Sequence, residues 1–403
     1  MLFAMKGEVG SRFMCAKTSK QSNNDVLFVT SFNPLSYRRP LLAKKALPCL
    51  KVYYLSRFKR MGPTGNLLLK CFLKIAKIES LFCRKTRSGG DYYVSALLRD
   101  FLTSFEFKGS KVGTVIALNP YLASQVIWGD EITVILDWMD VWMTPEGGMN
   151  PLDVITAEKA DGVIFWSKPM MELIARRVNL KKYTYVPHGI DLSVFDPLRY
   201  GHRECFIRKF GIENRFILLY SGGMWRVEGI DLQGTDKMLK AFSLVSRRLN
   251  NALLLLQVSR LDEQTLTLIK KLRLGSKVKV LGPLPYASFL RQSAFAAAQI
   301  LLAPSSRHPT AYYAERIKLF QYMAAGKAII AERTPGSLSV LGRSAFFVGL
   351  DDVEGMADAI VELASNKELR EELGARARER VQLFTWEKLA PVYRRFVLEI
   401  ANV

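Results

Sequence analysis

Histidine and cysteine are scarce in this chain. Its 403 residues include only three histidines and five cysteines. The histidines do not cluster and no two cysteines have the C-x2-C spacing, so neither structural zinc nor Ser–His–Asp hydrolysis is expected. Scattered cysteines in odd number favour a reducing compartment. The histidines are His188, His202 and His308, and the cysteines are Cys15, Cys49, Cys71, Cys83 and Cys205.

Long apolar runs are also missing. No run approaches the ~18–20 residues that a membrane-spanning helix needs, although 49% of the residues are hydrophobic and the mean hydropathy is +0.07. Residues 1–24 contain basic side chains but lack the apolar core of about 7–15 residues that a signal peptide has. We therefore expect an N-terminal extension at 1–24 and a cytoplasmic protein. Solenoid repeats and low-complexity tracts are absent as well.

Acidic residues are too few to balance the basic ones. There are 58 Lys and Arg against 37 Asp and Glu, a net charge of +21, and roughly 20 basic against 6 acidic residues lie in the first 110. Without zinc-finger or RNP strings, this charge favours an anionic membrane surface or a phosphorylated ligand, and no nucleic acid. A helix predicted at 66–87 carries four cations on one side, which predicts peripheral docking to the inner face of the membrane, with a simply solvated helix face as the alternative. The four are Lys70, Lys74, Lys77 and Arg84.

Apolar segments of strand length alternate with helical segments along the chain. This alternation predicts parallel, doubly wound sheets. A polar and basic stretch at 197–214 separates two sets of strands. We therefore expect an α/β fold with Rossmann-like domains at 25–197 and 215–383 and a last helix at 385–403. The expected strands are 25–30, 51–55, 112–118, 132–136 and 160–167 in the first domain, and 216–220, 253–256, 278–281, 300–303 and 328–331 in the second.

Three segments carry patterns that point to chemistry. Residues 315–330 form a charged turn that leads into a helix and then a buried strand, and a helix N-terminus reached by a loop holds phosphate well. Residues 185–197 place a Pro-His-Gly turn after a short strand. Residues 220–224 place two glycines after the first strand of the second domain, where the backbone can approach a diphosphate.

Together these segments resemble glycosyltransferase family 4, the retaining transferases of the GT-B fold, in which two Rossmann-like domains face a cleft. The family strings read roughly V-P-N-G-V-D-x3-F and K-L-F-E-Y-M-A-A-G-K-P-I-I. The resemblance implies a nucleotide-diphosphate sugar as co-substrate, no cofactor and no metal. It also implies a glycan or lipid-linked acceptor, and a last helix that crosses back to the first domain.

The sequence departs from the family pattern at three positions. Gln233 stands where the family has a lysine before glycine, and Tyr313 and Gln321 stand at the two positions of the family's E-x7-E motif. Glu315 lies two residues out of register. Glutamine still bonds ribose hydroxyls, so donor binding is compatible with these changes. The alternatives are a degenerate, non-catalytic GT-B protein that binds membrane or a partner, and a nucleotide-sugar epimerase on the same fold.

The resemblance also assigns candidate residues. Asp140, Arg226 and Lys318 are the catalytic candidates, the two cations because charge develops on the leaving diphosphate. Gln321 is expected to contact the ribose. Simple capping or solvated roles stay open for Asp140, Lys318 and His188. Further donor contacts are expected at Ser221, Gly222, Gly223, Gln233, Gly282, Glu315, Arg316, Ile317 and Leu319, and the acceptor side at Asp137, Trp138 and His188.

Overall fold

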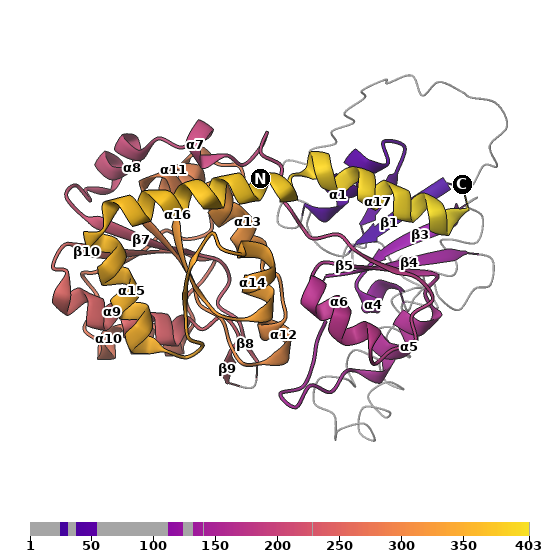
Figure 1. The fold of residues 1–403 in the computed structure, drawn as a ribbon, viewed down its shortest axis with the longest axis horizontal. Helices are drawn as coiled ribbons and strands as arrows, with labels where there is room; N and C mark the ends of the chain where they lie inside the picture. The colour runs from indigo at the N-terminus through magenta and orange to yellow at the C-terminus, as the bar shows by residue number, and fades with distance from the viewer. Residues whose placement is uncertain are drawn as a thin grey trace, which may run out of the picture.

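Two α/β domains stand side by side in the computed structural model (Figure 1). The structure describes residues 25–30, 38–54, 112–123, 132–139, 141–227 and 229–402. The extension expected at 1–24, the basic helix expected at 66–87 and the candidate Asp140 lie outside the described residues. No helix within the described ranges is long and apolar enough to cross a membrane.

The first domain is built on a six-stranded parallel sheet in the order β2-β1-β3-β4-β5-β6. Strand β1 pairs with both β2 and β3, so the strand order reverses beside it. The strands are β1 (Asp25–Thr30), β2 (Lys51–Tyr54), β3 (Val112–Leu118), β4 (Thr133–Trp138), β5 (Gly162–Phe165) and β6 (Tyr183–Tyr185), and the helices are α1 (Arg39–Ala46), α4 (Pro120–Ala123), α5 (Pro151–Lys159) and α6 (Lys168–Ala175).

The second domain repeats this plan with a parallel sheet in the order β11-β10-β7-β12-β13-β14. Side chains of β7 alternate between the two faces, as a strand buried on both sides requires. Ile217 and Leu219 enter one core, and Leu218 and Tyr220 enter the other. The strands are β7 (Phe216–Ser221), β10 (Ala252–Gln257), β11 (Val278–Val280), β12 (Ile300–Ala303), β13 (Ala328–Glu332) and β14 (Phe346–Val348), with a small hairpin of β8 (Arg226–Val227) and β9 (Ile230–Asp231).

Helices cover both faces of the second sheet. One core lies between the sheet and α8, α11 and α13, and the other between the sheet and α9, α10 and α15. Side chains at Asp262, Ser288 and Asp352 accept the first free N–H groups of their helices, which stabilises each start. The helices are α7 (Pro197–Tyr200), α8 (Arg203–Phe210), α9 (Thr235–Arg248), α10 (Glu263–Lys271), α11 (Phe289–Ala297), α12 (Pro309–Tyr312), α13 (Ile317–Ala324), α14 (Pro335–Leu341), α15 (Val353–Ser365) and α16 (Lys367–Arg380).

Two connections between the domains run beside each other. Helix α16 lies on the second domain, and α17 (Trp386–Ala401) then runs along the first (Figure 1). The N–H of Ile190 donates to the Phe384 carbonyl at 3.0 Å, and the N–H of Trp386 donates to the Ile190 carbonyl at 2.9 Å. Aromatic and aliphatic side chains of α17 complete the core of the first domain. The predicted doubly wound fold, including the helix that crosses back, is confirmed.

Candidate functional site

The loop after β7 lies at the carboxyl end of the second sheet, where doubly wound sheets bind ligands. The N–H of Ser221 donates to the Tyr322 hydroxyl at 2.9 Å, and the Tyr220 hydroxyl donates to the Gly223 carbonyl at 2.7 Å. The N–H of Gly222 donates to the carbonyl of Gln257, the last residue of β10, at 3.1 Å. These bonds fix the predicted Gly-Gly loop in place.

Lys318, in the first turn of α13, lies beside this loop. Its Nζ donates to Gln233 Oε1 at 3.1 Å and to the Tyr220 hydroxyl at 3.3 Å. The residue is only 8% exposed, and burial holds the pKa of Lys318 well below its usual range, with Arg316 acting in the same direction and Asp231 opposing. No carboxylate of the described residues forms an ion pair with Lys318. A buried amine with neutral partners stabilises an anion placed next to it.

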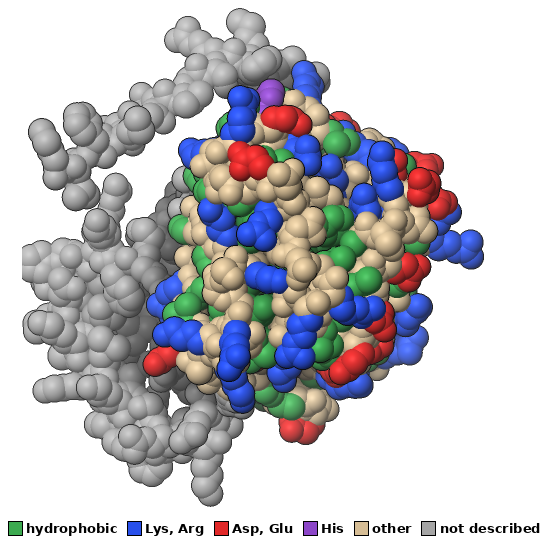
Figure 2. Space-filling model, turned by 90° about the vertical axis from the view of Figure 1, so that its left-hand side faces the viewer, with side chains coloured by type: hydrophobic (Ala, Val, Ile, Leu, Met, Phe, Trp, Pro, Cys, Tyr) green, Lys and Arg blue, Asp and Glu red, His purple; other side chains and the backbone are tan. Residues whose placement is uncertain are grey.

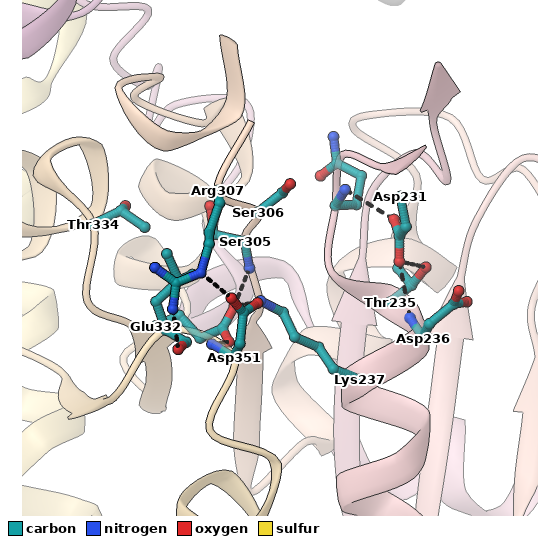
Figure 3. A network of polar contacts seen from close by, with 12 residues as sticks. Asp231, Thr235, Asp236, Lys237, Ser305, Ser306, Arg307, Glu332, Thr334 and Asp351 are labelled. Carbon is teal, nitrogen blue, oxygen red and sulfur yellow. Dashed lines mark hydrogen bonds and ion pairs between the residues drawn. The ribbon is translucent and has the colours of Figure 1, made fainter. Parts of the chain in front are cut away.

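Asp231 holds the start of α9 in position (Figure 3), and it also bonds to the backbone of Gln233. Its Oδ1 accepts the Gln233 N–H, and its Oδ2 accepts both the Thr235 hydroxyl and the Asp236 N–H, each at 2.9 Å. Gly234 has φ of +69°, and a Cβ there would lie 2.2 Å from a carbonyl oxygen of the neighbouring loop. Only glycine fits such a position. The glutamine that replaces the family lysine is therefore rigidly placed with its amide oxygen on Lys318.

A buried carboxylate network that sequence reasoning missed supports the same region (Figure 3). Glu332, the last residue of β13, is fully buried and accepts the N–H groups of Ser305 at 2.6 Å and Asp351 at 2.8 Å. Lys237 of α9 lies 2.7 Å from both the Glu332 and the Asp351 carboxylates. Burial raises the pKa of Glu332, and Lys237 opposes that shift. A lone Glu at the end of an apolar strand was the signal in the sequence.

Gln321 lies one turn after Lys318 on α13. Its Oε1 accepts a hydrogen bond from Arg291 Nη2 at 2.9 Å, and the same nitrogen is 3.5 Å from Ser221 Oγ. The Ser221 hydroxyl in turn donates to Gln257 Oε1. The structure thus brings the candidates Ser221, Gln321, Lys318 and Gln233 to one edge of the sheet. Arg291, from α11, was not singled out by the sequence.

Arg226 makes different contacts from those expected of a phosphate ligand. Its Nη1 and Nη2 donate to the Asp236 carboxylate at 2.9 and 2.6 Å, and its Nε donates to Asp262 Oδ2 at 3.0 Å. Hydrogen bonds to Asp236 raise the pKa of Arg226, and Asp262 adds to this. A diphosphate would have to compete with two carboxylates for this guanidinium, so the catalytic role of Arg226 stays a prediction.

Glu315 joins the two domains. Its Oε2 accepts the Tyr185 hydroxyl at 2.5 Å, and its Oε1 accepts the Ser339 hydroxyl at 2.7 Å and the Lys168 N–H at 3.1 Å. Burial raises the pKa of Glu315 to about 7, which these hydrogen bonds oppose. The expected donor-binding carboxylate is therefore engaged in contacts between β6, α6 and α14.

The other candidates around α13 have mixed surroundings. Arg316 precedes the helix, and its Nη2 donates to the Leu232 carbonyl at 3.1 Å. Ile317 packs against the first-domain core, while Leu319 is buried in the second. Gly282 has φ of +70° and open space around its Cα. The position of Gly282 thus leaves room for a ligand, whereas only the backbones of Ile317 and Leu319 could offer contacts.

Asp137, expected on the acceptor side, forms a buried ionic centre instead. Its oxygens accept from Arg39 Nε and Nη2 at 2.8 and 2.9 Å, from Trp166 Nε1 at 2.6 Å and from the Tyr393 hydroxyl at 3.1 Å. Both Arg39 and Asp137 are 0% exposed. The carboxylate therefore ties β4 to α1 and α17, and it has no surface to offer an acceptor.

Trp138 and His188 are buried as well. Trp138 stacks on Phe165 at 5.6 Å between ring centroids. His188 Nδ1 lies 3.0 Å from the Gly189 carbonyl, and burial lowers the pKa of His188 to about 4. The expectation that Asp137, Trp138 and His188 face the acceptor is corrected accordingly, because each side chain is enclosed by the first-domain core or the domain connection. Within the described ranges, no group of His, Cys, Asp and Glu is arranged to hold a metal.

Comparisons with known proteins agree with this geometry. Among solved structures, the chain is similar to sucrose-phosphate synthase from Thermosynechococcus elongatus, with a TM-score of 0.70, 15% identity and coverage of 94% of this chain and 99% of the other. It is also similar to Anabaena HepE in complex with UDP and glucose, with a TM-score of 0.68, 14% identity and coverage of 93% and 99%. A glycosyltransferase from Rickettsia africae matches with a TM-score of 0.67, 15% identity and coverage of 94% and 99%. These likenesses define a GT-B fold.

The family comparison is more specific for the second domain. Residues 215–366 match the protein-family model described as Glycosyl transferases group 1. The second domain therefore matches the glycosyl transferases group 1 model over these residues, and the fold of the chain is GT-B, as the motifs predicted. No curated protein matches the sequence significantly. The finer assignment to family 4 stays a prediction.

Proposed function

We propose that the protein is a glycosyltransferase that moves a sugar, with retention, from a nucleotide-diphosphate sugar to a glycan or a lipid-linked acceptor. One observation carries the proposal: the buried amine of Lys318 sits beside the Gly-Gly loop with only neutral partners, at the carboxyl end of a sheet in a group 1 domain. HepE is described in complex with UDP-glucose, which supports this donor as the first to test.

In the proposed reaction the bond between the sugar and the diphosphate breaks. Negative charge grows on the departing diphosphate, and donors already in place stabilise that charge most effectively. Lys318 Nζ is such a donor, and the Gly223 N–H is a candidate for another, whereas the Gly222 N–H is bonded to the Gln257 carbonyl. Gln233 keeps the amine oriented through its amide oxygen. An acceptor that attacks the face from which the diphosphate leaves gives retention without a protein nucleophile.

The proposal also covers the acceptor and the place in the cell where the protein acts. We propose an acceptor at an anionic membrane surface, because two-thirds of the excess positive charge lies in the first 110 residues. Lys and Arg side chains are also spread over the outer face of the second domain, with Asp and Glu side chains among them (Figure 2). Co-sedimentation with neutral and anionic vesicles at low and high salt tests this. Binding that ignores lipid charge or salt would favour a soluble acceptor.

Nucleotide release from a panel of nucleotide sugars tests the activity itself. We expect release with one donor, little release after Lys318→Met, and unchanged release after Lys240→Met, which removes an exposed lysine of α9. Tight binding without any turnover would favour the degenerate GT-B alternative, in line with the replacements at Gln233, Tyr313 and Gln321. Interconversion of the donor sugar without transfer would favour the epimerase.

A further inference from the structure

Arg291 occupies an unusual place in the second domain. It lies in the first turn of α11, and its Nη1 donates to the Leu284 carbonyl at 3.3 Å. Its Nη2 donates to Gln321 Oε1 at 2.9 Å and approaches Ser221 Oγ at 3.5 Å. Its Nε is fully buried and has no hydrogen-bond partner in the part of the chain that the structure describes. Arg291 thus links Ser221, at the start of the Gly-Gly loop, to Gln321, which stands at the second position of the family's E-x7-E motif.

The guanidinium dictates the orientation of the Gln321 amide. Arginine has only donors, so the amide must turn its oxygen toward Arg291, however the two amide atoms are assigned. That leaves Nε2, with two donors, as the polar end of Gln321 available to a ligand. A glutamate at this position would offer acceptors only. Gln321 therefore offers hydrogen-bond donors to a ligand where the family's glutamate offers acceptors.

Arg291 has no carboxylate as a direct partner among the described residues. No carboxylate of the described residues forms an ion pair with it. Arg291 and Arg38 of the first domain both lie over the Tyr286 ring, at 5.7 and 4.8 Å from its centroid. Asp191 acts on this tyrosine with the opposite charge, and its Oδ1 accepts the N–H and hydroxyl of Ser193. The region is thus rich in donors and positive charge.

We propose that Arg291 is a positioning residue of the donor site, which holds Gln321 so that its Nε2 donates to oxygen atoms of the nucleotide ribose. The inference rests on the proposed function and extends it by one residue and by the direction of the hydrogen bonds. The ligand class is a ribonucleoside diphosphate whose ribose oxygens act as acceptors toward Gln321. A buried donor without a partner is costly, so the orphaned Nε calls for a reason beyond fold stability.

Two further consequences separate this arrangement from a purely structural arginine. Gln321→Glu places a carboxylate next to Arg291, and the resulting ion pair holds one of its oxygens away from the ribose. The variant therefore does not regain the binding mode of the family glutamate while Arg291 is present. It regains that mode only in the double variant Arg291→Met/Gln321→Glu, in which the carboxylate is released.

The experiment measures affinity by calorimetry for the tightest binder among UDP, GDP and ADP, and for its 2′-deoxy analogue. One hydrogen bond to a neutral group corresponds to about a tenfold preference for the ribose form in the unmodified protein. We expect Arg291→Met to reduce this preference to about twofold, and Arg291→Lys to retain part of it. Arg247→Met, which removes an exposed cation in the last turn of α9, is the matched control and leaves the preference unchanged.

Coupling between the two side chains completes the test. If they act as a unit, Arg291→Met/Gln321→Met loses no more ribose preference than either single variant. Full preference in a folded Arg291→Met protein, or additive losses in the double variant, would overturn the inference while leaving donor binding intact. If no nucleoside diphosphate binds the unmodified protein, the proposed function fails and the inference fails with it.

Discussion

Lys318→Met is the most informative single change in this protein. Methionine fills nearly the same volume but removes the amine that bonds to Gln233 and Tyr220. A charge-assisted hydrogen bond to phosphate is worth about 1.5–3 kcal/mol, so nucleoside diphosphate affinity should fall by roughly 10- to 150-fold. The free energy of unfolding should stay constant or rise, because a poorly compensated buried amine is removed. We therefore expect Lys318→Met to weaken nucleoside diphosphate binding without lowering the free energy of unfolding.

The pH dependence gives a second readout of the same group. The pKa of Lys318 is lowered on folding, so between its folded and unfolded values the unfolded chain binds more protons. The free energy of unfolding contributed by Lys318 therefore rises with pH across that window, and Lys318→Met removes this slope. A bound diphosphate raises the pKa again, so binding takes up a proton wherever the free amine is neutral.

Calorimetry with UDP in two buffers of different ionisation enthalpy measures both affinity and proton uptake. Lys240→Met serves as the control on an exposed lysine of α9. Arg226→Ala should weaken UDP binding less than Lys318→Met, because Asp236 and Asp262 already neutralise that guanidinium. Unchanged UDP affinity in Lys318→Met, or a protein destabilised by several kcal/mol, would refute the view of Lys318 as an anion-binding amine.

Three further predictions concern stability, each measured by urea unfolding. The pKa of Glu315 is raised from 4.5 to about 7, so its contribution to the free energy of unfolding falls as pH rises through that window, by up to about 3 kcal/mol. Glu315→Gln should reduce this slope, leaving a part due to Asp153, whose pKa burial also raises to about 7; an unaltered slope would contradict the assignment. Asp137→Asn should lower the free energy of unfolding by about 3–5 kcal/mol by leaving Arg39 uncompensated, and Arg39→Met/Asp137→Asn should recover part of it, because the amide oxygen still accepts from Trp166 or Tyr393. Gly189→Ala should lower the free energy of unfolding by at least about 2 kcal/mol, because φ is +60° and an added Cβ would lie 2.2 Å from a leucine methyl. Wild-type stability of this variant would contradict the prediction.

The sequence was a good guide to the fold because the signals were local and periodic. The strands expected at 300–303 and 328–331 were found within one residue of those limits, since each is a buried apolar run. Strand β14 (Phe346–Val348) was not predicted. The β8–β9 hairpin was not predicted either, because two residues in each strand are too few to show a period.

The site was predictable only where a motif fixed the backbone. The Gly-Gly loop and the start of α13 lie at one sheet edge together with Lys318 and Gln321, whose roles stay predictions. The contacts of Arg226 and Asp137 depend on carboxylates and cations distant in sequence, which no local pattern reports. Arg291 was missed for a related reason, because a lone arginine in a helix start looks like a solvated side chain until α13 is placed beside it.

The returning helix α17 has a consequence for the order in which the chain acquires structure during synthesis. The first domain is translated first, yet Tyr393 and its neighbours on α17 complete its core and reach its buried carboxylate Asp137. Domains usually fold in the order in which they leave the ribosome. Here the apolar face of the first domain stays uncovered until the last residues leave the ribosome. The core of the second domain, by contrast, is complete once α16 and the short turn after it have been synthesised. We therefore expect the second domain to become protease-resistant first in a nascent chain, and chaperones to meet the first domain during that interval.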